Sequence, residues 1–394
     1  MGLFPTYLQH EIHFVDGTGA VLVDESGKEY LDFASGIGVV NLGHRHPRIE
    51  QALITQAQGI WHTSNLFASS LQQEVANLLC KMSGLGAVFF ANSGAEANEA
   101  AIKFARRWAK MVKIIQEPEI ITFQRSFHGR TLATLTATGQ DKVKDGFSPL
   151  PAGFRILPYG DIQAVKQATG ATTAAVLLEL VQGEGGVRPA DPAFVQALAA
   201  WCREKNILLM IDEVQTGMGR TGHWFAYQKY GIEPDVVTLA KGLGNGFPVG
   251  AMLAKAAWKE VLGPGSHGTT FGGGRLAMAV ARAVLEELSQ PSMMAEIRDK
   301  GTWLRQLLEK ELRGLISVQE IRGEGLMLGI ELNTSAGPVV KSLLEQGLVT
   351  LVAGENVLRL LPPLVVTHGQ IVRAVSLIKE VVQEWEWTAP VPAD

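Results

Sequence analysis

The hydrophobic residues in the middle of this 394-residue chain occur in short runs rich in Val, Ile and Leu, separated by stretches with helical periodicity. Such runs are typical of strands buried on both faces. Their alternation with helices predicts an α/β fold with a mostly parallel sheet. The predicted strands are Ala87–Ala91, Glu119–Phe123, Ala174–Leu180, Ile207–Ile211, Val236–Leu239 and Val249–Leu253, and the helices between them include Glu96–Lys110 and Pro192–Lys205.

The two ends of the chain show a different pattern. Residues 11–40 predict a short β-meander with a turn at Gly27. After about residue 275, a helical stretch interrupted near Pro291 leads into short strands and two further helices, an order that predicts a separate α+β domain. The elements expected there are Leu276–Leu312, Ser317–Arg322, Met327–Leu332, Pro338–Gln346, Leu348–Val352, Leu358–Leu360 and Thr367–Glu384.

Composition narrows the class of protein. Hydrophobic residues make up 46% of the chain and charged residues 19%, so we expect a large core and little disorder. The formal net charge of −4 argues against a nucleic-acid surface. No apolar run has the length of a membrane span, and no secretory signal is evident. Cys80 and Cys202 lack metal-binding spacing and fit a reducing cytosol, so we expect a cytoplasmic protein.

One lysine follows an apolar strand directly. Lys241 comes after Val236–Leu239 and enters a glycine-rich loop. Burial disfavours the charged form of a lysine, and the commonest chemical use of such a lysine is a Schiff base. Asp212 follows the strand Ile207–Ile211, 29 residues upstream, which is enough for one crossover between neighbouring parallel strands. A carboxylate there suits a protonated pyridine nitrogen, although an aspartate that caps a helix is also common.

Further polar residues follow other predicted strands. Asn92–Glu99 opens a helix, and the free N–H groups at a helix N-terminus suit a phosphate, although an ordinary capped helix has the same sequence features. The loop Ser126–Arg130 is able to place Phe127 against a flat ring and Arg130 on a carboxylate. His128 in the same loop is equally consistent with a structural role in the turn.

Three more features bear on the site. Glu184 lies in a glycine-rich segment after a predicted strand, and Arg359 is a lone cation in an apolar stretch that fits either a carboxylate binder or a structural ion pair. His267–Gly274 is a polar loop, suited to an anion or to a plain connection. Ligands bind at strand ends in open α/β sheets, so these residues favour one shared site. His44 and His46 lack acidic or thiol partners nearby in the sequence, which disfavours a metal site.

With these motifs together, the chain resembles the class III, subgroup II aminotransferases, which are pyridoxal 5'-phosphate enzymes of fold type I. The resemblance runs from Leu31 to Leu364, and Thr63–Phe67 resembles the acetylornithine branch, whereas Ala68 and Arg275 depart from the family's pattern. The motifs that carry it, in the family's order, are Asn92–Asn98, Ser126–Arg130, Gln182–Gly186, Asp212–Gly222, Lys241–Gly250 and His267–Gly273.

The resemblance implies an architecture and an assembly. Residues 46–275 would form the large cofactor-binding domain around a seven-stranded, mostly parallel sheet. Residues 276–394 would form a smaller α+β domain, which the N-terminal segment 1–45 joins. The active sites would lie at the interface of a homodimer, with small-molecule substrates and no metal, nucleic acid or membrane as partner.

The resemblance also implies a role for each candidate residue. Lys241 would carry pyridoxal phosphate as a Schiff base and shuttle protons, while Asp212 would pair with the pyridine nitrogen. The other cofactor contacts would be Gly94 and Ala95 at the phosphate together with Thr270 from the neighbouring subunit, Phe127 and Val214 on the two faces of the ring, and Gln215 on the side of the phenolic oxygen. Substrate contacts would come from Arg130, Thr269, Arg359 and Glu184.

The implied reaction moves the terminal amino group of N-acetylornithine to 2-oxoglutarate and gives N-acetylglutamate semialdehyde and glutamate, a step of arginine biosynthesis. Arg359 would bind the α-carboxylate of glutamate, and Glu184 would neutralise Arg359 while the other donor is bound. Alternatives within the family are aminotransferases for ornithine, succinyldiaminopimelate, γ-aminobutyrate or other ω-amines. A glutamate-1-semialdehyde aminomutase and a non-catalytic pyridoxal-phosphate carrier are further alternatives.

Overall fold

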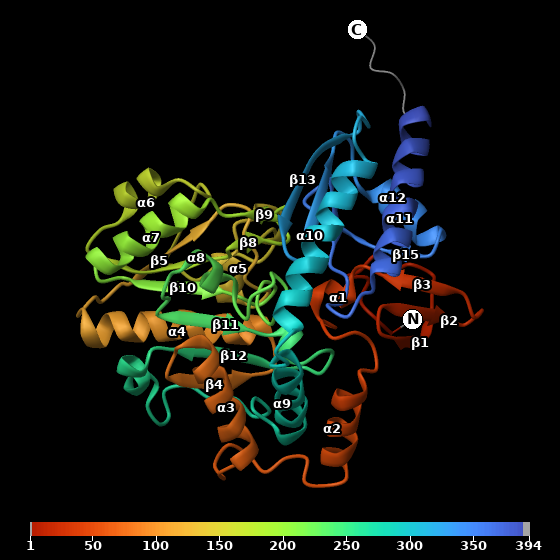
Figure 1. Ribbon diagram of the computed structural model, residues 1–394. Helices are drawn as coiled ribbons and strands as arrows, with labels where there is room; N and C mark the ends of the chain where they lie inside the picture. Colours follow the sequence, from red (N-terminus) through yellow and green to blue (C-terminus); the bar gives the residue numbers. More distant parts are fainter. Residues whose placement is uncertain (1, 389–394) are drawn as a thin grey trace.

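The structure, a computed structural model, describes residues 2–388. Its largest element is a seven-stranded sheet in the order β4-β12-β11-β10-β7-β5-β6 (Figure 1). Only β12 runs antiparallel to its neighbours among these strands, which confirms the mostly parallel sheet. The strands are β4 (Ala87–Ala91), β5 (Glu119–Phe123), β6 (Phe154–Leu157), β7 (Thr173–Leu178), β10 (Leu208–Asp212), β11 (Val236–Leu239) and β12 (Gly250–Ala254).

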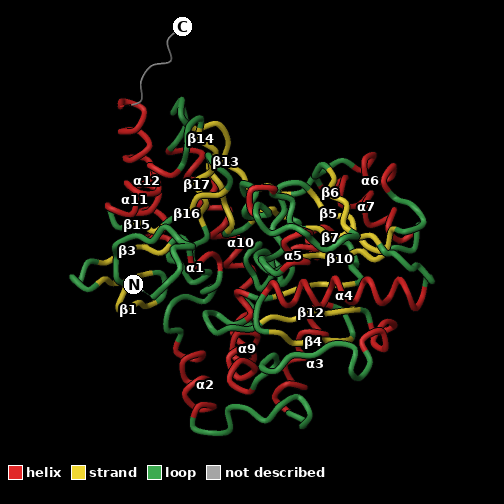
Figure 2. The backbone as a smooth tube through the Cα atoms, turned by 180° about the vertical axis from the view of Figure 1, so that it is seen from behind, coloured by secondary structure: helices red, strands yellow, loops and turns green. Residues whose placement is uncertain are grey.

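The central strands are buried on both faces, as their continuous apolar runs predict. Successive residues of a strand point to opposite sides, so Leu177 and Met210 join one core cluster while Leu178 and Ile211 join another. The first cluster is filled by α4 (Gly94–Val112), which lies along the sheet in both views (Figures 1 and 2). The second is filled largely from α7 (Pro192–Glu204) and α9 (Arg275–Leu288).

The first and last parts of the chain meet in the fold. Strand β3 (Glu29–Asp32) pairs in parallel with β15 (Leu348–Val349), and the two lie on the side of the molecule away from α6 and α7 (Figure 1). We propose from this pairing that segments 1–45 and 276–394 form one domain and residues 46–275 the other. α9, at the start of the C-terminal segment, packs instead against α2 (Pro47–Ala57) and α3 (Ser70–Ser83).

The remaining strands form three smaller sheets. β3 and β15 belong to a sheet with β1 (Phe14–Thr18) and β2 (Val21–Asp24). A second, antiparallel sheet carries Arg359 and has the order β13-β14-β17-β16. Its strands are β13 (Val318–Glu324), β14 (Met327–Leu332), β16 (Leu351–Ala353) and β17 (Val357–Leu360), and the short pair is β8 (Val181–Gln182) and β9 (Arg188–Pro189).

The expected helices are present, and each of the expected central strands appears within two residues of its predicted bounds. The stretch predicted at Leu276–Leu312 forms two helices, α9 and α10, with the break at Pro291. The other helices are α1 (Ser35–Gly38), α5 (Leu132–Ala137), α6 (Ile162–Ala168), α8 (Ala226–Tyr230), α10 (Met293–Glu311), α11 (Gly337–Glu345) and α12 (His368–Thr388), with short 3₁₀ turns η1 (Asp141–Val143), η2 (Lys241–Leu243) and η3 (Ala256–Leu262).

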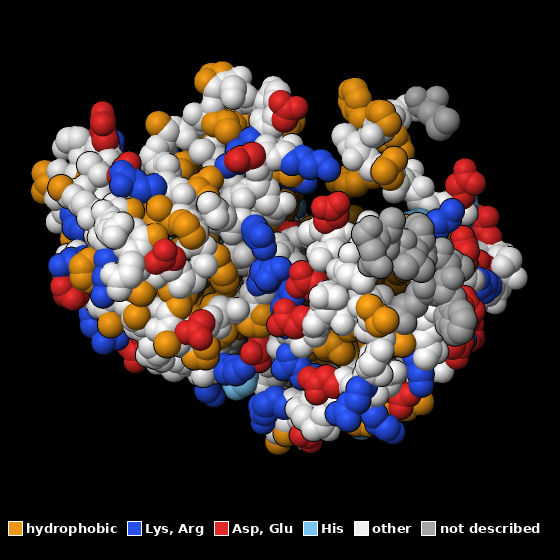
Figure 3. Space-filling view, turned by 90° about the horizontal axis from the view of Figure 1, so that it is seen from above, with side chains coloured by type: hydrophobic (Ala, Val, Ile, Leu, Met, Phe, Trp, Pro, Cys, Tyr) orange, Lys and Arg blue, Asp and Glu red, His pale blue; other side chains and the backbone are white. Residues whose placement is uncertain are grey.

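The surface seen from above carries acidic and basic side chains interspersed, without a large area of one sign on that face (Figure 3). Within residues 2–388, no helix combines the length and the apolar character that a membrane crossing requires.

The topology of the large sheet determines which residues lie together at its edge. Strands β4, β5, β7, β10 and β11 all end at one edge, so the residues that follow them are brought together there.

Candidate active site

A cavity of about 380 Å³ lies at this edge of the sheet, and Lys241 lines it. Lys241 begins η2 directly after β11 and has a φ of 43°, an uncommon backbone conformation for a residue with a side chain. Burial lowers the pKa of Lys241 below its usual value, although the carboxylates of Glu184 and Asp212 oppose this shift. A lowered pKa increases the fraction of neutral amine, which is the form that attacks a carbonyl carbon.

Asp212 ends β10 and lines the same cavity. Its Oδ2 lies 2.8 Å from His128 Nδ1 and accepts a second hydrogen bond of 2.8 Å from the Asn98 amide. Its Oδ1 accepts from the Val214 N–H at 3.0 Å. The Thr238 hydroxyl in turn donates to Asn98 Oδ1 at 2.7 Å, so the Asn98 amide is itself held in one orientation. The carboxylate is therefore fixed from three directions before any ligand arrives.

The helix α4 begins at the same edge, as predicted from its capping residues. The Ser93 hydroxyl accepts from the Glu96 N–H at 3.1 Å, and Glu96 Oε2 accepts from the Asn92 N–H at 2.6 Å. The first N–H groups of a helix, here at Gly94 and Ala95, have no carbonyl of the preceding turn to bind. Both residues line the cavity, so this helix end offers N–H donors and a positive dipole to an anion.

Gly94 also governs the position of a neighbouring side chain. A Cβ atom at position 94 would lie 2.8 Å from Val214 Cγ1, closer than side chains pack. The absence of a side chain at Gly94 therefore lets Val214 lie over the helix end and form one wall of the cavity.

Another wall of the cavity comes from the loop after β5. Phe127 lines the cavity, and the guanidinium of the exposed Arg130 lies 5.6 Å from the centre of its ring. The Phe127 N–H donates to Glu179 Oε2 at 2.9 Å. Burial raises the pKa of Glu179 well above its usual value, and the charge of Asp212 adds to this shift. Glu179 therefore favours the neutral acid and holds the backbone of Phe127.

Glu184 and Arg359 form an ion pair beside the lysine. Arg359 Nη1 donates to Glu184 Oε1 at 2.6 Å, and Nη2 donates to Oε2 at 3.3 Å. Burial by itself would raise the pKa of Glu184, but Arg359 and Lys241 lower it below its usual value overall. Only 2% of the Arg359 side chain is exposed against 32% of Glu184, so Glu184 is the partner able to turn toward water.

The other predicted site residues are placed as follows. Gln215 lines the cavity, and its Oε1 lies 3.5 Å from Arg359 Nη1, so it also borders the ion pair. Thr269 and Thr270 are not among the residues that line this cavity in the described chain. Thr270 lines a second, smaller pocket, while Thr269 Oγ1 accepts from the Gly272 N–H at 3.1 Å.

The residues present fit pyridoxal phosphate. Lys241 supplies an amine for its aldehyde and Asp212 a fixed carboxylate for its ring nitrogen. Phe127 and Val214 provide two apolar walls, and the first turn of α4 supplies donors for its phosphate. The cavity is therefore suited in shape and chemistry to a flat, phosphorylated pyridine.

The family model described as "Aminotransferase class-III" matches residues 6–382 of the chain. The chain is a class-III aminotransferase. This membership confirms the fold type and the cofactor, pyridoxal 5'-phosphate, that the sequence motifs indicate.

Relatives of this aminotransferase are similar to it in sequence and structure over almost their whole length. An acetylornithine aminotransferase of Bacillus cereus is 50% identical over 96% of this chain and 97% of its own. The solved N-acetylornithine aminotransferase of Stenotrophomonas maltophilia has a TM-score of 0.85 and 37% identity, covering 97% of this chain and 98% of that one. An ornithine aminotransferase of Toxoplasma gondii, solved with partial occupancy of PLP at its active site, has a TM-score of 0.94 and 33% identity and covers 98% and 93%.

Three residues of this aminotransferase's site were not assigned a functional role from the sequence. The sequence places His128 in a turn and gives no sign that it contacts Asp212 directly. Asn98 and Glu179 were not singled out, because each lies inside an otherwise regular helix or strand pattern. A polar residue on the buried side of an amphipathic helix is the one signal that would have pointed to Asn98.

Proposed function

We propose that this aminotransferase moves the terminal amino group of N-acetylornithine to 2-oxoglutarate, giving N-acetylglutamate semialdehyde and glutamate for arginine biosynthesis. The observation that carries the proposal is the Glu184–Arg359 ion pair at the border of the lysine cavity, which Glu184 lines and Arg359 does not. The choice of donor is supported by acetylornithine aminotransferases that are about half identical to this chain over nearly full length.

The ion pair lets one site accept two unlike donors. With glutamate, Glu184 would turn away and Arg359 would bind the α-carboxylate bidentately, while Arg130, beside Phe127, would bind the second carboxylate. With a terminal amine, the carboxylate lies far from the reacting carbon, and Glu184 neutralises Arg359. Without that neutralisation a buried, unpaired guanidinium would face an uncharged part of the donor, which is costly.

The remaining site residues would divide the chemistry between them. The cofactor, when bound, supplies an electron-withdrawing ring that makes a proton on the substrate carbon acidic. Lys241 would hold the cofactor covalently and, when released by the donor, would move that proton with its Nζ. Asp212 would keep the ring nitrogen protonated, and the first turn of α4 would bind the phosphate.

We further infer a homodimer in the cytoplasm, in which Thr270 would serve the partner's site. The Asn65 amide donates to Thr269 O at 3.2 Å and so joins two segments that expose apolar side chains. Leu66 is 88% exposed and Phe271 is 67% exposed. Adjacent exposed apolar residues are typical of a surface that a second protein covers, which supports the proposed dimer.

The main alternative is an ornithine aminotransferase, because several such enzymes have similar structures with TM-scores up to 0.95. Their sequence identity is lower, at 33% for that neighbour. Aminotransferases for succinyldiaminopimelate or γ-aminobutyrate share the need for a terminal-amine site, and an aminomutase would turn over without 2-oxoglutarate.

A panel of donors with 2-oxoglutarate as acceptor tests the proposal. We expect kcat/KM to be at least about tenfold higher for N-acetylornithine than for ornithine, succinyldiaminopimelate or γ-aminobutyrate. A higher value for ornithine would replace the proposed donor. Turnover that does not depend on 2-oxoglutarate would indicate the aminomutase.

A further inference from the structure

Arg322 is a buried arginine outside the cavity, and it contacts the backbone of the segment that carries Glu184. It lies on β13, in the same antiparallel sheet as Arg359. Its Nη2 donates to Gly186 O at 2.7 Å, and its Nε donates to Gly186 O at 3.0 Å and to Val187 O at 3.2 Å. Both members of the Glu184–Arg359 pair are therefore anchored to one sheet.

The segment that Arg322 holds has a strained backbone. Val187 has a φ of 49°, a genuine outlier for a β-branched residue, and Gly186 has a φ of 107°. Such conformations persist only where the surroundings enforce them, and they cluster at functional sites. Val187 is fully buried against β14, where a Cβ atom at Gly329 would lie only 2.9 Å from Val187 Cβ.

A third contact fixes the backbone at Glu184 itself. The Gly354 N–H donates to Glu184 O at 2.9 Å from the turn between β16 and β17. The backbone is thus tied to the sheet at positions 184, 186 and 187, while the Glu184 side chain remains 32% exposed. The ion pair therefore opens by rotation of the Glu184 side chain, while the backbone stays in place.

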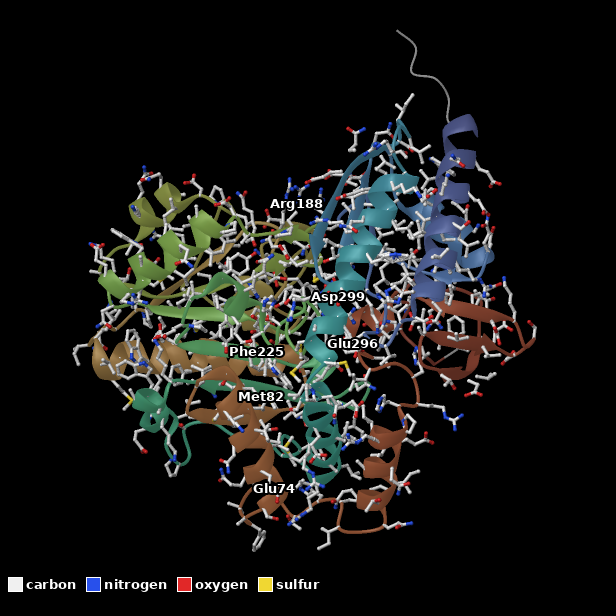
Figure 4. The ribbon with its side chains drawn as sticks, viewed as in Figure 1. Glu74, Met82, Arg188, Phe225, Glu296 and Asp299 are labelled. Atoms are coloured by element: carbon white, nitrogen blue, oxygen red, sulfur yellow. The ribbon has the colours of Figure 1, made fainter. Side chains whose placement is uncertain are left out.

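The charge of Arg322 is balanced without any group of the cavity. Glu320 Oε2 accepts from its Nη1 at 2.6 Å, and Glu331 pairs with the same nitrogen. Arg188 lies beside this cluster where the Glu184 segment meets β13, with its Nη2 3.6 Å from Glu331 (Figure 4). Arg322 touches no residue of the lysine cavity through its side chain in the described contacts, so it can act only through the segment it holds.

We propose that Arg322 is a positioning residue for donor selection: by fixing the backbone at Gly186 and Val187, it keeps Glu184 aimed at Arg359 whenever no α-carboxylate is bound. The inference rests on the proposed use of the ion pair for two donors. When the segment is loosened, Glu184 spends less time on Arg359, and the freed guanidinium favours α-carboxylate ligands over terminal amines.

Arg322→Lys tests this, because lysine keeps the positive charge for Glu331 but cannot place a planar set of donors on two carbonyl oxygens. For each donor, the single-turnover reaction of the holoenzyme gives a specificity constant. We expect the ratio for N-acetylornithine over glutamate to fall at least about tenfold, the size of effect that a small displacement of an active-site group produces. Glutarate, an unreactive dicarboxylate, should bind the variant more tightly.

Glu320→Gln is the matched control, because it removes an ion-pair partner of Arg322 and leaves the carbonyl contacts in place. It should leave the donor ratio and glutarate binding unchanged. Equal losses with both donors in Arg322→Lys, with unchanged glutarate binding, would overturn the proposal and indicate a merely structural role.

A second variant tests the proposal if Arg322→Lys does not fold. Val187→Gly relaxes the strained segment without touching Arg322 and should shift the donor ratio and glutarate binding in the same direction. An unchanged ratio in a folded Val187→Gly variant would also contradict the proposal. If the wild-type enzyme fails to react with N-acetylornithine, the proposed function falls, and glutarate binding still decides whether Arg322 controls access to Arg359.

Discussion

His128 Nδ1 lies 2.8 Å from Asp212 Oδ2, although the two residues are 84 positions apart, Asp212 at the end of β10 and His128 in the loop after β5. Both are almost completely buried, and a hydrogen bond to a charged group contributes about 1.5–3 kcal/mol. The contact fixes the carboxylate that, in the proposed function, would face the ring nitrogen of the cofactor. We therefore treat His128 as a positioning residue.

His128→Ala should lower kcat by about 10- to 100-fold, which is the rate equivalent of one hydrogen bond to a charged group. The pH at which the bound cofactor changes its absorption should shift as well, because the carboxylate of Asp212, which would pair with the ring nitrogen, is held less firmly. His44→Ala is a matched control, since His44 Nε2 lies 2.7 Å from Asp32 Oδ2 in a similar pair that does not line the cavity. Equal effects of the two variants would argue against a special role for His128.

Lys241→Ala should lower transamination at least about 10³-fold, because the variant loses both the covalent attachment and the group that moves the proton. The fold should persist, as circular dichroism and thermal unfolding would show. Lys255→Ala, at a partly exposed lysine that pairs with Asp235 at 2.8 Å, is the control and should keep normal turnover. Near-normal activity of Lys241→Ala would contradict the assignment of the site.

Glu184→Ala should weaken the preference for the terminal-amine donor over glutamate, because Arg359 then remains charged and unpaired when that donor is bound. The loss of one close, partly buried ion pair predicts a change of about 10-fold or more in the ratio of kcat/KM values. Steady-state kinetics with both donors measures it. An unchanged donor preference would mean that the Glu184–Arg359 ion pair does not determine dual specificity.

Glu213 predicts a pH dependence of stability. Burial raises its pKa from 4.5 to about 7, so the folded state favours the protonated acid. Because the folded pKa lies above the unfolded one, the stability from this group is complete below about pH 4.5 and is lost as the pH rises toward about 7. Between about pH 5 and about pH 8, this loss amounts to about 2 kcal/mol.

Glu213→Gln cannot ionise and should lack this part of the pH dependence. Urea unfolding at about pH 5 and about pH 8 gives the free energy of unfolding of wild type and variant at each pH. Between the two pH values, the variant should gain about 2 kcal/mol in this free energy relative to wild type. A constant difference would mean that Glu213 titrates normally in the folded protein.

The sequence was sufficient to predict most of the sheet, because residues buried on both faces leave continuous apolar runs. It did not show β6, whose Arg155 is exposed and pairs with Glu119 at 3.0 Å. A short edge strand buries too little to produce such a run. The insertion of β12, antiparallel, between β4 and β11 also depends on tertiary pairing.

The candidate site, like the sheet, could be predicted from the sequence only in part. Lys241 and Asp212 stand out because a charged residue directly after a buried strand is unusual. The contacts of Asp212 with His128 and Asn98 join residues 84 and 114 positions apart, and no local pattern encodes a contact at that distance along the chain. The roles of Arg130, Glu184 and Arg359 came from the family resemblance, and of these three the structure joins only Glu184 and Arg359 in an ion pair.

The parallel pairing of Leu31 with Leu348 has a consequence for how the protein is made. The strands of the large sheet lie between residues 87 and 254, so that sheet can assemble while synthesis continues. Strand β3 leaves the ribosome early but must wait for β15, more than 300 residues later. During that interval its unpaired edge is open to wrong partners, and the slowest step of folding should be this long-range closure.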